Sequence, residues 1–446
     1  MPDLGEVARR VAGWAREGEQ VEAYVSWARE TDVRAYQGDV ESLSSAESEG
    51  IGIRVISRSR QGFAYGGSLD EQVLADTLAE ARDNASFATE DPAVGLPEPD
   101  GRPAVELDLW RDELVVLPAA DKVAMALELE RQVKAGDPRV RQVEASFGDV
   151  AVEVAVASST GVFAAHRRTA CHVAGEAVVG DPDDSHVGVG YSVGRAPADL
   201  DLTKASEEAV RLATRLIGAR KPRSARLPVV LDRRVTTSLL GVLSGTFSGE
   251  AVLKGRSLFA ERMGEPVAAG SVTLVDDPTI AEAFAATPHD AEGLATRRNV
   301  LIDGGVLSAF LYDSYSARRA GTTSTGSAVR GGFKGAPGVG CRALSLAPGH
   351  LDLDGILADI GEGLLVQSMS GLHSGVNPVS GDFSVGVEGL MFRNGELAEP
   401  VREATMASTL QRMLLEVVAI GGDLEWLPGM AAGLTLAIDG ISVSGS

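Results

Sequence analysis

The 446-residue sequence has few cysteine, histidine and aromatic residues. Its two cysteines, Cys171 and Cys341, lie far apart and outside any Cys-x-x-Cys pair, so we expect neither a disulfide framework nor a structural zinc site. No stretch approaches the roughly 18 apolar residues that a membrane span needs, and residues 1–20 lack the apolar core of a signal peptide. These absences predict a soluble cytoplasmic protein with no membrane partner.

Positively charged residues are also scarce. The chain has 41 Lys and Arg residues against 63 Asp and Glu residues, which gives a formal net charge of −22. Such a field repels phosphate, so we expect no nucleic-acid partner. The basic residues between Arg211 and Arg226 are explained more simply as the end of a helix followed by a linker.

The first half of the chain mixes helical and strand patterns. Apolar residues at helical spacing predict helices near residues 4–14, 68–88, 125–136 and 203–217. Alternating residues predict a strand at 21–27, a hairpin at 50–67 and an antiparallel meander at 143–179. We therefore expect an α+β fold in which residues 1–222 form an N-terminal mixed α/β domain with an antiparallel sheet.

Glycine-containing turns dominate the second half. Asp303-Gly304-Gly305, Asn394-Gly395 and Asp439-Gly440 each predict a hairpin, and Asn-Gly is the dipeptide that most favours one. Residues 402–419 are predicted to form a helix, and no repeated halves are visible in the sequence. We expect residues 223–446 to form a mainly antiparallel β domain, either a barrel or a sandwich.

The stretch FSGEAVLKGRS (247–257) raises the question of a metal site. Glu250 follows Gly249 and precedes Lys254 by four residues, so histidines at those two positions would give His-Glu-x-x-x-His. Glycine has no ligand, however, and the lysine would bring a positive charge to the place of a cation. The residues alone predict no metal here, and a Glu250 that satisfies backbone donors at the start of a helix.

Two other kinds of site are weaker candidates. Ser248 and Lys254 could form a Ser–Lys pair, but no Gly-x-Ser-x-Gly elbow accompanies them. The glycine-rich stretch RGGFKGAPGVG (330–340) could cradle phosphate, yet it lacks Walker spacing. We expect a mobile loop there.

Four stretches together resemble the C-terminal half of the TldD/TldE (PmbA) proteins. They begin with FSGEAV, TRRNVL, GLHSGV and LTLAID, and they cover residues 247–279, 296–321, 371–397 and 434–445. The N-terminal half is similar more loosely, through GIGIRVI (50–56) and the helix at 68–88.

This resemblance implies a function. In that family the TldD subunit carries His-Glu-x-x-x-His and a later cysteine as zinc ligands and base, whereas TldE lacks them. The two subunits form a heterodimeric metalloprotease that trims unfolded or modified peptides. Here Gly249 and Lys254 replace the histidines, and GGDLEWLPGM (421–430) has no cysteine. The resemblance thus implies a non-catalytic TldE-like subunit without its own cofactor, whose TldD-like partner holds the zinc.

The resemblance also suggests where an extended peptide could bind. The segment 371–386 is shaped by glycines and a proline, and His373 and Asn377 in it could bind a peptide backbone or only brace a turn. With Ser248, Glu250 and Lys254 they are the candidate residues for a peptide or partner cleft. Two other functions stay open: a stand-alone hydrolase with an unrecognised mechanism, and a regulatory modulator of DNA gyrase, an older label of the family.

Overall fold

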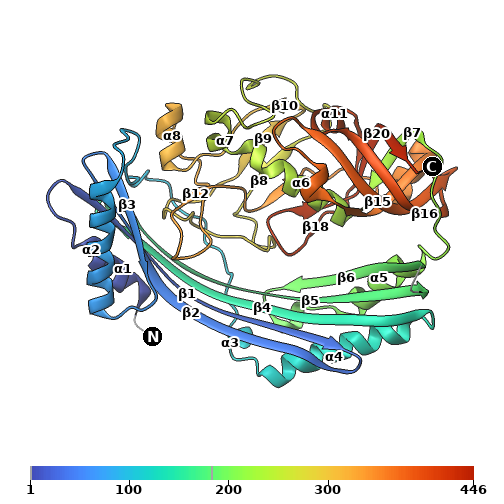
Figure 1. Cartoon of the computed structure of the whole chain (residues 1–446), viewed down its shortest axis with the longest axis horizontal. Helices are drawn as coiled ribbons and strands as arrows, with labels where there is room; N and C mark the ends of the chain where they lie inside the picture. The colour runs from blue at the N-terminus through green and yellow to red at the C-terminus, as the bar shows by residue number, and fades with distance from the viewer. Residues whose placement is uncertain (1–2, 182–183, 446) are drawn as a thin grey trace.

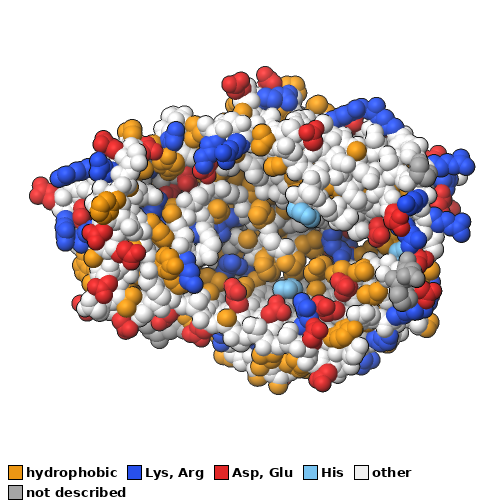
Figure 2. All heavy atoms as spheres, viewed as in Figure 1, with side chains coloured by type: hydrophobic (Ala, Val, Ile, Leu, Met, Phe, Trp, Pro, Cys, Tyr) orange, Lys and Arg blue, Asp and Glu red, His pale blue; other side chains and the backbone are white. Residues whose placement is uncertain are grey.

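The computed structural model of the protein describes residues 3–181 and 184–445. Long, curved strands of the N-terminal half form one layer, and the C-terminal half lies over their concave side (Figure 1). The face shown in Figure 2 is hollowed between these two halves. Within the described ranges no helix is long and apolar enough to cross a membrane. The predicted α+β fold is confirmed.

The N-terminal layer is a six-stranded antiparallel sheet in the order β3-β2-β1-β4-β5-β6. Its strands are β1 (Glu19–Tyr36), β2 (Asp39–Ser57), β3 (Arg60–Gly66), β4 (Val140–Ser158), β5 (Phe163–Asp181) and β6 (Asp184–Gly194). The predicted hairpin at 50–67 is confirmed, with Arg58 and Ser59 at φ 51° and 57° in the turn between β2 and β3. The predicted meander is formed by β4 and β5.

A repeat that the sequence did not reveal organises this layer. The order helix, three strands, helix occurs twice, and the first strands of the two units, β1 and β4, pair at the centre. The helices are α1 (Leu4–Ala12) and α2 (Glu71–Phe87) in the first unit, and α4 (Ala119–Gly136) and α5 (Leu202–Thr214) in the second. Because α2 packs on β3 and α5 on β6, each unit covers its own outer strand.

The C-terminal half contains a closed barrel, so of the two predicted architectures the barrel is correct. Its sheet runs β16-β15-β14-β7-β20, and β16 also pairs with β20, which closes the ring. The strands are β7 (Ala225–Leu231), β14 (Glu362–Ser370), β15 (Asp382–Arg393), β16 (Glu396–Thr409) and β20 (Leu436–Ser444). The Asn394-Gly395 turn joins β15 to β16 with both residues at positive φ, as predicted.

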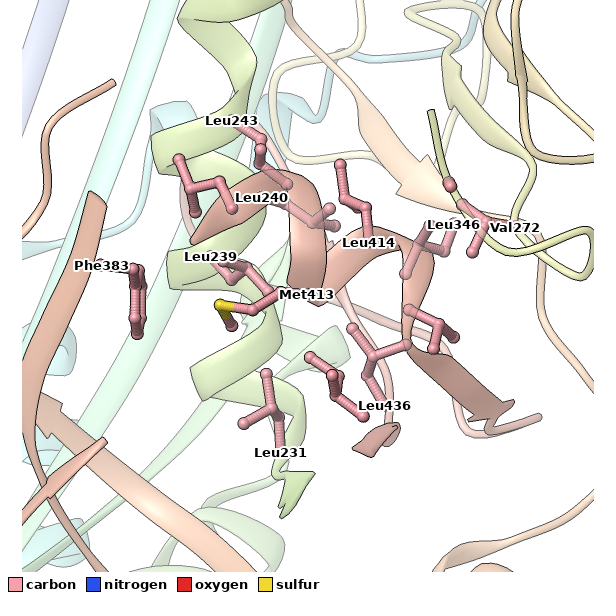
Figure 3. Close-up of a cluster of buried hydrophobic side chains, with 14 of the residues drawn as sticks. Leu231, Leu239, Leu240, Leu243, Val272, Leu346, Phe383, Met413, Leu414 and Leu436 are labelled. Atoms are coloured by element: carbon pink, nitrogen blue, oxygen red, sulfur yellow. The ribbon is translucent and has the colours of Figure 1, made fainter. Parts of the chain in front are cut away.

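Two helices pack apolar side chains together in the core of this half. Leu239, Leu240 and Leu243 of α6 (Arg233–Ser244) lie beside Met413 and Leu414 of α11 (Leu410–Leu415) in Figure 3. All five side chains are buried. This packing fixes the end of α6, from which the segment 247–257 continues.

Two predictions of secondary structure are wrong. Residues 402–419 form the end of β16, α11 and β17 (Val417–Ile420) instead of one helix, because β16 pairs with both β15 and β20 and this pairing overrides local helical preference. Asp439-Gly440 is not a hairpin turn. It forms a bulge within β20, where the register against β7 shifts between Ile438 and Ile441.

A buried ionic network joins the two halves. Arg54 of β2 donates through Nε to Glu22 Oε1 of β1 at 2.9 Å and through Nη2 to Glu292 Oε1 at 3.0 Å. Arg330 also pairs with Glu22. Burial alone would raise the pKa of Glu22, but the charges of Arg330 and Arg54 outweigh it and hold the pKa below its usual value.

Replacing Arg54 by methionine tests this junction. The change leaves Glu292 buried without its cation, and breaking a buried pair typically costs about 3–5 kcal/mol. We expect the denaturation midpoint, followed by circular dichroism in urea, to fall strongly. Arg393→Met, which removes an exposed pair with Glu399, is the matched control and should leave the midpoint unchanged. Equal midpoints for the two variants would contradict a stabilising role for the network.

Candidate functional site

The backbone at the start of segment 247–257 forms hydrogen bonds with Leu311, and a short helix follows directly. Leu311 N donates to Phe247 O at 2.8 Å, and Gly249 N donates to Leu311 O at 2.7 Å. The helix α7 (Gly249–Leu253) then begins, with Ser248 as its N-cap. The backbone at Gly249 is therefore fixed against residues 311–312.

Gly249 occupies a position where no larger residue fits. A Cβ atom added there would overlap Cδ1 and Cε1 of the Tyr312 ring and lie 2.9 Å from Leu311 O. The Tyr312 ring thus fills the space that the first histidine of His-Glu-x-x-x-His would need. The residues present at this point do not fit a zinc ion.

Glu250 and Lys254 bind each other. Their side chains form an ion pair one helical turn apart, with 46% and 54% of the side-chain surface exposed. Exposed pairs of this kind contribute little to stability. Ser248 Oγ faces Ala251 N at 3.5 Å, in the position of a helix cap. Lys254 is therefore engaged by Glu250, which leaves the Ser–Lys pair without structural support.

His373 and Asn377 lie in a second neighbourhood. Asn377 Oδ1 accepts hydrogen bonds from Val379 N at 2.9 Å and Ser380 N at 3.2 Å, so its side chain braces the turn before β15. His373 is exposed on α10 (Leu372–Gly375), which packs against β15. The helix α7 packs instead against α8 (Ser314–Ala320). The five predicted residues thus belong to two groups with different packing partners.

The remaining metal-ligating side chains do not supply a site either. Among the residues that the structure describes, no three His, Cys, Asp or Glu side chains are grouped closely enough to hold an ion. In the segment 421–430, Asp423 accepts from Thr435 and Glu425 pairs with Lys204 and Arg233. Burial raises the pKa of the Cys171 thiol to about 12.

A cavity between the two halves is a feature that the sequence did not predict. It has a volume of about 430 Å³ and lies between the concave face of the N-terminal sheet and C-terminal loops. Its polar lining includes Tyr24, His166, Arg168, His289, Arg330 and Arg342. Figure 2 shows Lys or Arg side chains inside the hollow between the halves.

The sequence held only partial signals for this cavity. Alternation in β5 places His166 and Arg168 on one face, but nothing local places Arg342 beside them. The glycine-rich stretch 330–340 was expected to be a mobile loop. Its residues 330–334 line the cavity wall, and the Phe333 side chain is buried against Tyr24 and Val154. The site is assembled by strands and loops that are distant in the chain.

The cavity is electrostatically unusual. Burial, then the neighbouring Arg342 and Arg195, lower the pKa of Arg168 to about 10. Burial, then His289 and the two arginines 342 and 168, lower the pKa of His166 to about 3. His166 and His289 stack with ring centroids 6.1 Å apart. Burial also lowers the pKa of His289, so both imidazoles are neutral at neutral pH.

Gly249→Ala tests the close contact with Tyr312. The added methyl group should cost about 1–3 kcal/mol of stability, the usual range for an overpacked site. Gly241→Ala is the control, since Gly241 lies in α6 with open space around its Cα, and there alanine should stabilise the helix by about 0.5–1 kcal/mol. Thermal unfolding of both variants measures the difference. If Gly249→Ala is as stable as the original chain, the ring does not exclude a side chain.

Comparison with known proteins covers nearly the whole chain. Models of the PmbA/TldA metallopeptidase domains match residues 21–85 (domain 1), 112–217 (central domain) and 224–445 (C-terminal domain). The metalloprotease PmbA of Escherichia coli O157:H7 is 28% identical over 419 residues, which cover 93% of this chain and 90% of the relative.

Solved structures show the same fold. TldE from Thermococcus kodakarensis has a TM-score of 0.89 at 23% identity, covering 96% of this chain and 97% of that one. A Thermotoga maritima MSB8 protein has a TM-score of 0.90 at 24% identity, covering 98% of this chain and 99% of that one. By its sequence matches along three consecutive domains, the chain belongs to the PmbA/TldD (TldE) metallopeptidase family.

Proposed function

We propose that this chain is a cytoplasmic TldE-like subunit, which carries no catalytic zinc and acts with a zinc-bearing TldD-like partner on extended peptides. The observation that carries the proposal is the environment of Gly249. The Tyr312 ring excludes a ligand there, and Lys254, at the place of the second ligand, pairs with Glu250. A zinc ion held by this segment would need both positions.

In this proposal the chain has two domains, residues 1–222 and 223–446, and its role is to shape a peptide cleft. The family matches support the boundary, since one ends at residue 217 and the next begins at residue 224. Ser248, Glu250, Lys254 and His373 are exposed or partly exposed and are available to a peptide or a partner. Asn377 would support the cleft through the turn that it braces.

The two alternatives have less support. A stand-alone hydrolase would need a nucleophile with a base, and Lys254 is paired with Glu250 instead of Ser248. A modulator that binds DNA would need a basic surface, which a net charge of −22 opposes.

Reconstitution tests the proposal. The purified chain should not cleave an unstructured peptide, whereas its mixture with a zinc-bearing TldD-like subunit from the same organism should, and a chelator should abolish that cleavage. The double variant Gly249→His with Lys254→His should stay inactive alone and bind no stoichiometric zinc, since Tyr312 still fills the site and no groups are in place to orient the new imidazoles. Proteolysis by either form alone would refute the assignment.

Separate substitutions at residues 373 and 377 test the cleft. His373→Ala should lower peptide turnover by the reconstituted complex and leave thermal unfolding unchanged, because the structure gives its exposed side chain no bracing role. Asn377→Ala should cost about 0.5–1.5 kcal/mol of stability, since two backbone donors lose their acceptor. Unchanged turnover with His373→Ala would remove this residue from the cleft.

A further inference from the structure

Two arginines that line the cavity, Arg168 and Arg342, each have a buried nitrogen without a hydrogen-bond partner among the described residues. Nη1 of Arg168 and Nε of Arg342 are buried without a hydrogen bond, and neither guanidinium forms an ion pair with any residue in the described ranges. Elsewhere in the chain, Arg54 and Arg233 each bind two carboxylates. Acidic residues are in excess in this sequence, so these half-buried arginines without an ion pair are not a consequence of composition.

These two cations also repel each other. Arg342 contributes to the lowered pKa of Arg168, after burial. A buried charge without a counter-charge is costly, and the cost is offset only by an anion with good hydrogen-bond geometry. Such an arrangement persists where a ligand supplies the missing charge.

The acidic groups near the cavity balance that charge only in part, since Asp276 attracts Arg342 and Glu30 attracts Arg168 but neither carboxylate forms an ion pair with its arginine. Asp290 accepts hydrogen bonds from three backbone N–H groups, and burial, then Glu292, raises its pKa to about 7. Asp276 Oδ1 accepts from Arg342 N and Ala343 N, each at 2.8 Å, and burial raises its pKa to about 6. Glu30 lies exposed at the rim.

The rest of the lining suits a small organic anion. Arg330 is held in the wall by its pair with Glu22, and Tyr24 and Phe333 add aromatic surface. Thr287 Oγ1 donates to His289 O at 2.8 Å, so Nε2 of His166, 3.2 Å away, donates to the hydroxyl. Nδ1 of His166 is then an acceptor, so the guanidiniums and not this imidazole supply the donors for an anion. A volume of about 430 Å³ lies within the range of small-molecule sites.

We propose that this cavity is an oxyanion-binding site, in which Arg168 and Arg342 hold a carboxylate or phosphate group of a small organic anion. The planar guanidinium fork binds either group through paired hydrogen bonds. The site is formed entirely by this chain and does not depend on the proposed partner subunit.

Calorimetric titration of the full chain with inorganic phosphate, succinate and the neutral analogue succinamide tests the proposal. Phosphate or succinate should bind saturably and succinamide should not, and the stronger of the two anions identifies the chemical source. Arg168→Gln with Arg342→Gln should weaken that binding about 10–100-fold, as expected for lost charge-assisted hydrogen bonds. Arg393→Gln, on the exposed surface, is the control for general loss of positive charge.

Two further measurements separate binding from a structural role. The double variant should unfold at the same or a higher temperature than the original chain, because it removes two charges that repel each other and form no ion pair among the described residues. In the unaltered chain, the anion should raise the pKa of His166, followed by NMR of its imidazole, because it neutralises the arginines that help to lower it. Absence of saturable binding by both anions, equal binding in the double variant, or an unmoved His166 pKa would overturn the proposal.

Discussion

The structure depends on the buried ionic network of Glu22, Arg54, Glu292 and Arg330. Each half contributes one carboxylate and one guanidinium, and all four side chains are almost entirely buried. Desolvating four charges is costly, and the cost is offset only while every partner is present. The network therefore fixes one arrangement of the sheet against the C-terminal loops. This arrangement also determines the shape of the cavity beside it.

The same junction orders the loops around it. Glu292 also accepts hydrogen bonds from the backbone and side chain of Ser314, the first residue of α8. The helix α8 in turn packs against α7, and it follows directly on Tyr312, the residue that covers Gly249. The ionic network between the two halves and the closely packed Gly249 are thus linked through one short segment, residues 311–314.

The parts of the fold that could be predicted from the sequence are those set by the conformational preferences of neighbouring residues. The hairpin at Asn394-Gly395 was predictable because both residues must adopt positive φ, which few dipeptides favour. Asp439-Gly440 gave the same local signal, but β20 pairs across it with β7 and makes it a bulge. The prediction of a helix at residues 402–419 was wrong for a related reason. It could not take account of the pairing of β16 with β15 and β20, which depends on residues far away in the chain.

The candidate site also has parts that the sequence predicted and parts that it did not. The loss of metal ligands at Gly249 and Lys254 was visible in the sequence, but the ring of Tyr312 over Gly249 required the structure because the two residues are far apart in the chain. The cavity could not be predicted, because it brings β1, β4 and β5 together with three C-terminal segments. Only the period of two in β5 indicated that His166 and Arg168 share a face.

The backbone positions of the two unpaired arginines are set by bonds that do not involve their charges. Arg168 is held in β5 opposite Val152 of β4, and Arg342 is held by the hydrogen bond from its own N–H to Asp276. Neither guanidinium is needed to form these contacts, and the two charges repel each other. Their side chains can therefore respond to an anion in the cavity, and the ionic network that joins the halves fixes the space in which that anion must fit.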